Sequence, residues 1–145
     1  MIGHMATTRT ATTHWEGSLL EGAGRVDLGS SGLGTFDVTW ASRAEEPEGR
    51  TSPEELIAAA HSACFSMALS HALAQAGNPP AALDTQADVT FQPGEGITGI
   101  KLTVVGSVPG ITADEFAEFA EGAKKNCPVS QALAAPITLE VSFTA

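Results

Sequence analysis

The two cysteines, Cys64 and Cys127, are the residues best suited to redox chemistry in this chain. A cysteine thiolate can attack a peroxide, and a second thiol can convert the resulting sulfenic acid to a disulfide. This chemistry needs a thiolate, a cation that stabilises it, a carboxylate that orients the cation, and a thiol that recycles the sulfur. The two cysteines could supply the first and last parts. Alternatively, both are inert core residues, since free cysteines are among the most buried residue types.

Glu54 is the candidate for the carboxylate. Glu55 follows Ser52 by three residues and can complete a capping box, so Glu54 has no such local role and could pair with an arginine. The alternative is that both glutamates interact with the helix dipole. A helical rise of about 15 Å separates Glu54 from Cys64. We therefore expect a second copy of the chain to bring its own Glu54 and arginine to this cysteine.

His61 precedes Cys64 by three residues, a spacing that could indicate a histidine-activated nucleophile or half of a zinc site. A zinc site needs further ligands, and the other histidines and Cys127 show no ligand spacing of a closed site. We therefore interpret His61 as a hydrogen-bonded core histidine, and no metal is expected.

The helix that carries Cys64 is the longest periodic segment of the chain, from Thr51 to Gly77. Pro53 suits the first helical position, and Gly77 followed by Asn-Pro-Pro ends the periodic pattern. Apolar residues lie on nearly every side, so we expect this helix to be buried almost all round. One broad side is expected to hold Ile57, Ala60, Cys64, Met67, Ala68, His71 and Leu73.

The remaining segments predict an α+β domain with a largely antiparallel sheet. Because one small sheet cannot cover a helix that is apolar all round, we expect a two-fold dimer. The segment 42–55, which contains Arg43 and Arg50, is expected to be a loop, and a short helical turn is expected at 129–133. Strands are expected at 6–20, 25–28, 35–40, 83–91, 97–107 (as the central strand) and 137–143, with a second helix that begins after Thr112 and ends near Asn126.

Composition restricts the class of protein. The chain has 145 residues, which suits one domain, and a net charge of −10 with seven Lys and Arg, which argues against nucleic acid or an anionic membrane as partner. We find neither the apolar core of a signal peptide nor an apolar run of membrane-spanning length, so the cytoplasm is expected, where a disulfide is more often transient than structural. Gly3-His4-Met5 resembles a cloning remnant, so residues 1–5 are set apart from a domain expected at 6–145.

Four segments of the chain are distinctive in sequence and order: THWEGSLLEGAGRV, TSPEELIAAAHSACFSMALSHALAQAG, KKNCPVSQAL and ITLEVSF. Together they resemble the OsmC/Ohr family of bacterial hydroperoxide reductases, and its OsmC branch in particular. The resemblance covers nearly the whole chain from Thr13 onward. It implies an OsmC/Ohr-like α+β fold with antiparallel sheets around a central buried helix, in an intertwined homodimer with two active sites at the subunit interface. It also implies a thiol peroxidase that acts on organic hydroperoxides and on hydrogen peroxide.

Carried over by position, the resemblance implies that Cys64 is the peroxidatic cysteine, Cys127 the resolving cysteine and Glu54 the active-site glutamate. Arg43 is the first choice for the family's arginine and Arg25 the second. No metal, haem or flavin is implied, and the expected reductant is a dihydrolipoyl protein or a small thiol. The alternative is a non-catalytic ligand-binding or interaction dimer of the same fold, in which both cysteines are core residues.

Overall fold

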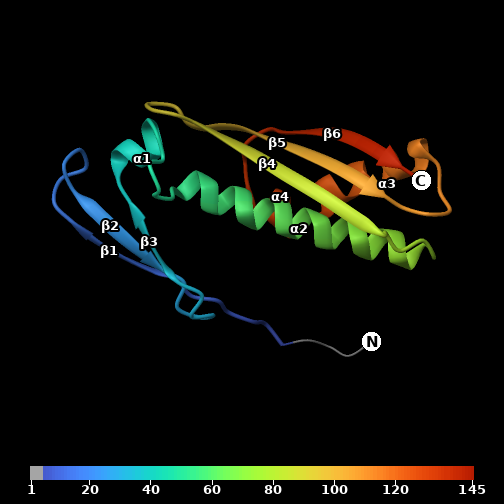
Figure 1. Cartoon of the computed structure of the whole chain (residues 1–145), viewed down its shortest axis with the longest axis horizontal. Helices are drawn as coiled ribbons and strands as arrows, with labels where there is room; N and C mark the ends of the chain where they lie inside the picture. The colour runs from blue at the N-terminus through green and yellow to red at the C-terminus, as the bar shows by residue number, and fades with distance from the viewer. Residues whose placement is uncertain (1–4) are drawn as a thin grey trace. The chain divides into compact units, whose positions relative to one another are not determined.

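The computed structural model describes residues 5–145, which form two compact units (Figure 1). The first unit extends to Pro53, and the second runs from Glu54 to Ala145. Gly3 and His4 of the expected cloning remnant lie outside the described residues.

The first unit contains a three-stranded antiparallel sheet in the order β1-β2-β3. The predicted hairpin is confirmed, but the first strand is much shorter than the range 6–20. It ends where Gly17 adopts φ +92°, a backbone conformation that glycine reaches without strain. The strands are β1 (Thr12–Glu16), β2 (Ala23–Asp27) and β3 (Thr35–Val38).

A short helix, α1 (Trp40–Ala44), follows β3, although we expected strand to Trp40 and loop beyond it. Thr39 caps this helix by accepting a hydrogen bond from the Ser42 N–H (3.1 Å), and the Ser42 hydroxyl oxygen accepts from the Thr39 N–H (3.0 Å). This reciprocal cap uses serine where the usual box has Glu or Gln. Arg43 therefore lies on a helix and not in a loop.

The two faces of the first unit's sheet differ in polarity. The register places His14, Arg25 and Asp37 on one face, while Trp15, Val26, Phe36 and Val38 lie on the other. The apolar face remains partly open to solvent, since Trp15 is 38% exposed and Phe36 is 40% exposed.

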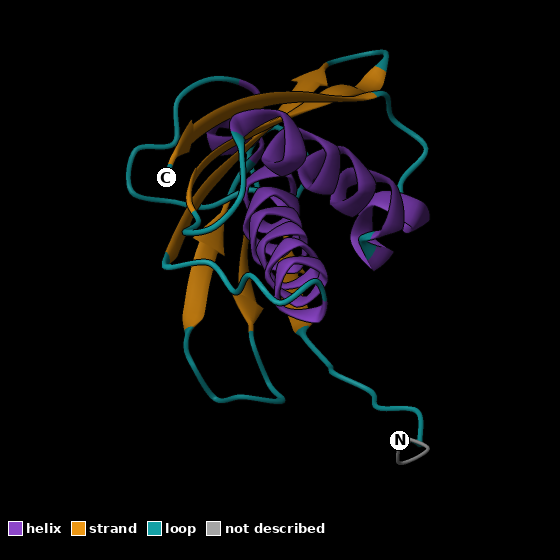
Figure 2. Cartoon of the chain, turned by 90° about the vertical axis from the view of Figure 1, so that its right-hand side faces the viewer, coloured by secondary structure: helices purple, strands orange, loops and turns teal. Residues whose placement is uncertain are grey.

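The second unit places helices against one face of a second three-stranded sheet (Figure 2). The sheet order is β4-β5-β6, so 97–107 is the central strand, as predicted. β5 is antiparallel to β4 but parallel to β6, so the prediction of an antiparallel sheet was wrong for this pair. The two helices between β5 and β6 form the crossover that a parallel pair requires. The elements are α2 (Pro53–Gln75), β4 (Ala82–Gln92), β5 (Gly96–Ser107), α3 (Ala113–Asn126), α4 (Pro128–Ala132) and β6 (Ile137–Thr144).

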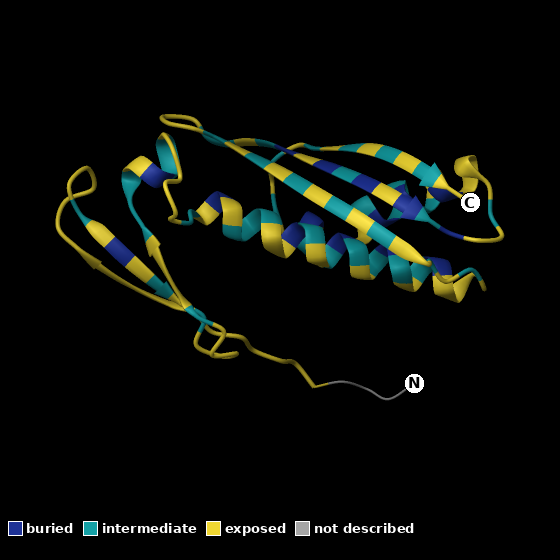
Figure 3. Cartoon of the chain, viewed as in Figure 1, coloured by how far each residue is buried: buried dark blue, intermediate teal, exposed yellow. Residues whose placement is uncertain are grey.

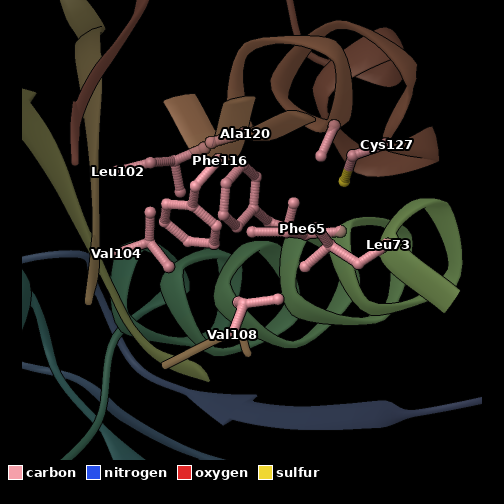
Figure 4. Close-up of a cluster of buried hydrophobic side chains, with 10 residues drawn as sticks. Phe65, Leu73, Leu102, Val104, Val108, Phe116, Ala120 and Cys127 are labelled. Atoms are coloured by element: carbon pink, nitrogen blue, oxygen red, sulfur yellow. The ribbon is translucent and has the colours of Figure 1, made fainter. Parts of the chain in front are cut away.

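The core of the second unit lies between α2, α3 and the inner face of the sheet (Figure 4). The ring of Phe116 packs 5.3 Å from that of Phe143, measured between centroids. Gly106 leaves room for this ring, because a Cβ atom at position 106 would collide with Phe116. The fully buried members include Phe65, Leu69, Leu73, Leu102, Val104, Val108, Phe116 and Cys127.

In the single chain α2 is buried along one stripe only, so the expectation that it is buried almost all round depends on the expected second copy. The core-facing stripe is His61, Phe65, Leu69 and Leu73, spaced every four residues, whereas Met67 is 72% exposed. Figure 3 shows buried and exposed residues interspersed along this helix. By length and composition alone, α2 is long and apolar enough to cross a membrane. We had expected no apolar run to approach that length. A core helix of a water-soluble fold passes the same test.

Candidate active site

The structure brings the two cysteines together. Cys64 is half-buried on α2, and Cys127 is fully buried where α3 ends and α4 begins. Both are free thiols, and they lie close enough for Cys127 to affect the pKa of Cys64. Their separation of 63 residues had left this approach open at the sequence level. The arrangement places a thiol that could recycle Cys64 next to it.

The backbone on both sides of Cys127 is held by hydrogen bonds. Its N–H donates to the Ala123 carbonyl (2.9 Å), and its own carbonyl accepts from the Gln131 N–H (3.0 Å). Pro128 occupies the first position of α4, where a helix needs no N–H donor. The chain therefore turns at Cys127, and its sulfur points toward α2 (Figure 4).

The surroundings of Cys64 act on its pKa in both directions. Burial raises the pKa of the Cys64 thiol above its ordinary value, and the hydrogen bond with Cys127 raises it further, while a hydrogen bond from the Val129 N–H lowers it. The net direction is upward, so these groups favour the thiol over the thiolate. A reactive Cys64 therefore needs a cation in addition to the groups that raise its pKa.

His61 is a hydrogen-bonded core histidine, as the sequence indicated. It is fully buried, and its Nε2 lies 2.7 Å from the Ser130 Oγ of α4. Burial lowers the pKa of His61, so the ring is neutral near pH 7. Among residues 5–145, no three His, Cys, Asp or Glu side chains are placed to hold a metal ion. We did not foresee Ser130 as the partner; the one signal was a polar residue beside Cys-Pro-Val.

The remaining predicted site residues are found at three separate places in the chain. Glu54 is buried in the first turn of α2. Arg43 is in the last turn of α1, and Arg25 lies on β2, with its Nε 3.8 Å from the Asp37 Oδ1 in an exposed pair. The assignment of Glu54 and either arginine to the site of Cys64 stays a prediction.

An apolar pocket of about 210 Å³ opens between the start of α2 and the segment that follows α4. Ile57 contributes to it from α2 and precedes Cys64 by seven residues, which is two helical turns along the same face. The other lining residues are Ile97, Ile100, Leu133, Ala134 and Ala135.

These observations define a two-cysteine thiol protein with an α+β fold, and comparison with known proteins identifies its family. The family described as OsmC-like protein matches residues 46–142. Peroxiredoxin OsmC of Escherichia coli (strain K12) is 45% identical over 139 residues, which cover 94% of this chain and 96% of that protein. The chain therefore belongs to the OsmC family.

Two further relatives agree with this assignment. Organic hydroperoxide resistance protein OhrB of Bacillus subtilis (strain 168) is 29% identical over 103 residues, which cover 70% of this chain and 75% of that protein. The crystal structure of an organic hydroperoxide resistance protein OsmC from Legionella pneumophila superposes with a TM-score of 0.66 at 22% identity, covering 98% of this chain and 100% of that one. The latter similarity confirms the OsmC/Ohr-like α+β fold.

Proposed function

We propose that this protein is a cysteine-based thiol peroxidase that reduces organic hydroperoxides, and also hydrogen peroxide, to alcohols or water. The peroxidase class is supported by the 45% identity to a peroxiredoxin over most of the chain. The observation that carries the proposal is the proximity of the Cys64 and Cys127 thiols, since a disulfide within the chain can form only between two sulfurs that approach each other.

The reaction proceeds through two bond exchanges at the Cys64 sulfur. The Cys64 thiolate attacks the distal oxygen of the hydroperoxide, so that an S–O bond forms, the O–O bond breaks and the alkoxide leaves as the alcohol after it takes up a proton. The Cys127 sulfur then attacks the sulfenic acid; an S–S bond forms, the S–O bond breaks and water leaves. A dithiol, either a dihydrolipoyl protein or a small thiol reagent, reduces the disulfide and is itself oxidised.

We propose Arg43 as the cation that stabilises the Cys64 thiolate, oriented by Glu54, with Arg25 as the alternative. Such a cation is what a reactive Cys64 requires, because an adjacent guanidinium would counteract the effect of burial, which raises the pKa of the thiol. The burial of Glu54 also supports a paired role, because carboxylates are seldom buried without a cation or donors.

We propose that the active form is an intertwined homodimer. The exposed apolar residues of α2, such as Met67, and the apolar face of the first unit's sheet, with Trp15 and Phe36, are surfaces that a second copy would cover. The helical rise of about 15 Å between Glu54 and Cys64 also favours a site completed by two chains. We further propose that residues 6–145 act as one domain and that the protein works in the cytoplasm.

A non-catalytic binding dimer is the second candidate, and the raised pKa of Cys64 favours it, because a protonated thiol is a poor nucleophile. The rate of alkylation by iodoacetamide near neutral pH separates the two functions. A peroxidatic Cys64 reacts far faster than a free thiol compound of ordinary pKa, and a core cysteine reacts far more slowly.

Replacement of each cysteine tests the catalytic roles. Cys64→Ser should abolish the consumption of cumene hydroperoxide. Cys127→Ser should consume one equivalent per chain and then stop, in the absence of a reductant, with Cys64 oxidised. Retained turnover in Cys64→Ser would contradict the proposed function.

A further inference from the structure

The hydrogen bond between His61 and Ser130 joins the two helical segments that carry the cysteines. The Nε2–Oγ distance is 2.7 Å, and both residues are buried although 69 positions separate them in the chain. His61 precedes Cys64 by three residues on α2, and Ser130 follows Cys127 by three residues on α4. The bond thus lies one helical turn from each thiol.

A short helix such as α4 depends on tertiary contacts for its position more than a long helix does, and this hydrogen bond is one of them. α4 has five residues, too few for a helix that is stable alone, so packing must hold it in place. Ser130 is its buried residue, and Val129, the residue before, packs against the core. The polar contact that joins this buried position to α2 is the one with His61.

Two interactions with Cys64 come from the same short stretch. Cys127 and the backbone N–H of Val129 both affect the pKa of the Cys64 thiol, so both groups lie beside its sulfur. A displacement of α4 would move both groups together. The geometry of the thiol pair is therefore coupled to the bond at Ser130.

We propose that His61 and Ser130 are a positioning pair that holds Cys127 against Cys64, so that the resolving sulfur attacks the oxidised Cys64 at its full rate. His61 and Ser130 act through α4 and contact no reacting atom. This inference rests on the proposed function, because it assigns a role in the disulfide-forming step. General stabilisation would affect the whole fold, whereas this role affects only the step in which the Cys64–Cys127 disulfide forms.

The test uses the full chain with Ser130→Ala, which removes the hydroxyl, and Ser130→Thr, which keeps one. Ser66→Ala is the matched control, since the Ser66 Oγ also makes a hydrogen bond of 2.7 Å from α2, to the Thr85 Oγ1, in a part-buried position. A single equivalent of cumene hydroperoxide is mixed with reduced protein and excess dimedone. Mass spectrometry then measures how sulfenic acid divides between the Cys64–Cys127 disulfide and the dimedone adduct.

We expect Ser130→Ala to shift this division about tenfold toward the adduct, the effect of one lost buried hydrogen bond on a rate. Ser130→Thr and Ser66→Ala should divide as the wild type does. The ratio does not depend on how fast the sulfenic acid forms, so it isolates the resolving step. An unchanged ratio in Ser130→Ala, or the same shift in Ser66→Ala, would overturn the proposal. If Ser130→Ala does not fold, His61→Asn takes its place, because its shorter side chain breaks the same hydrogen bond from the other end. A shift toward the adduct would again support the proposal, and an unchanged ratio would overturn it.

A second oxidant separates this proposal from the proposed function. Diamide oxidises a thiol pair without peroxide: one thiolate adds to its N=N bond, and the second thiol displaces the hydrazine to form the disulfide. If the wild type consumes no hydroperoxide but forms the disulfide with diamide, the peroxidase proposal fails, while slower disulfide formation in Ser130→Ala still supports the positioning pair. If neither oxidant yields a Cys64–Cys127 disulfide, both proposals fail.

Discussion

Replacement of Met67 by glutamate should dissociate the proposed homodimer. Met67 lies on the side of α2 away from the core and is 72% exposed in the single chain. Its neighbours on this side include Ala63 and Ala74 together with the polar residues Ser70 and His71. A second chain packed on this side of α2 would cover the methionine, and glutamate keeps a good helix former at the position.

The size of the effect follows from the area that becomes buried. Full burial of a methionine side chain stabilises by about 1.5–3 kcal/mol. Because 72% of Met67 is available for burial, the dimer interface would gain about 1–2 kcal/mol of burial free energy per chain. The residue occurs twice in a two-fold interface, so the gain for the dimer is about 2–4 kcal/mol. The dissociation constant should therefore rise about 30- to 700-fold, before the cost of burying two carboxylates is added.

Sedimentation or light scattering over a dilution series measures this change. Val105→Glu is the matched control, because Val105 is 44% exposed on the polar outer face of the second unit's sheet, between Asp84 and Ser142. Its dissociation constant should be that of the wild type. A Met67→Glu protein that dimerises as tightly as Val105→Glu would refute the assignment of this side of α2 to the interface.

Three further predictions concern single residues. Arg43→Gln should raise the pH at which Cys64 becomes reactive to iodoacetamide, because burial then acts without a nearby cation; an unchanged midpoint would favour the second candidate arginine. Gly106→Ala should destabilise by about 1–3 kcal/mol in urea unfolding, because the new methyl group meets the ring of Phe116; a smaller loss would mean that the ring can move aside. The pKa of His61 lies below its unfolded value of 6.5, so the unfolded state binds more protons than the folded state below about pH 6.5. The free energy of unfolding therefore decreases as the pH is lowered through this range, by up to about 1.4 kcal/mol per pH unit. His61→Gln should show a shallower decrease in acid.

The elements that sequence predicted well are those with local signals. The helix expected after Thr112 begins there, because Thr112 and Glu115 form a capping box with hydrogen bonds of 3.1 and 2.9 Å. Gly77 with φ +88° follows the end of α2. Alternation of apolar and polar residues located β4, β5 and β6 to within one residue at each end. Signals of this kind lie within a few residues of one another, so the sequence displays them directly.

The features that the sequence did not predict are contacts between distant segments. Parallel pairing of β6 with β5 depends on the crossover through α3 and α4, and alternation in a strand does not reveal the direction of its neighbour. The composition of α2 showed that it was apolar, but not that its own chain covers one stripe and leaves Met67 exposed.

The candidate site shows the same division between local and distant information. Sequence selected Cys64 and Cys127 by residue type, and their contact emerged from the fold. Ser130 was missed because its partner His61 is 69 residues away.

Consumption of cumene hydroperoxide by pre-reduced protein, with no reductant added, tests the central claim most directly. The account predicts one hydroperoxide reduced per chain, the loss of both thiols, and a Cys64–Cys127 linkage in the peptide map. Survival of both thiols in excess hydroperoxide would contradict it, and the OsmC-family fold would then serve a function other than peroxide reduction.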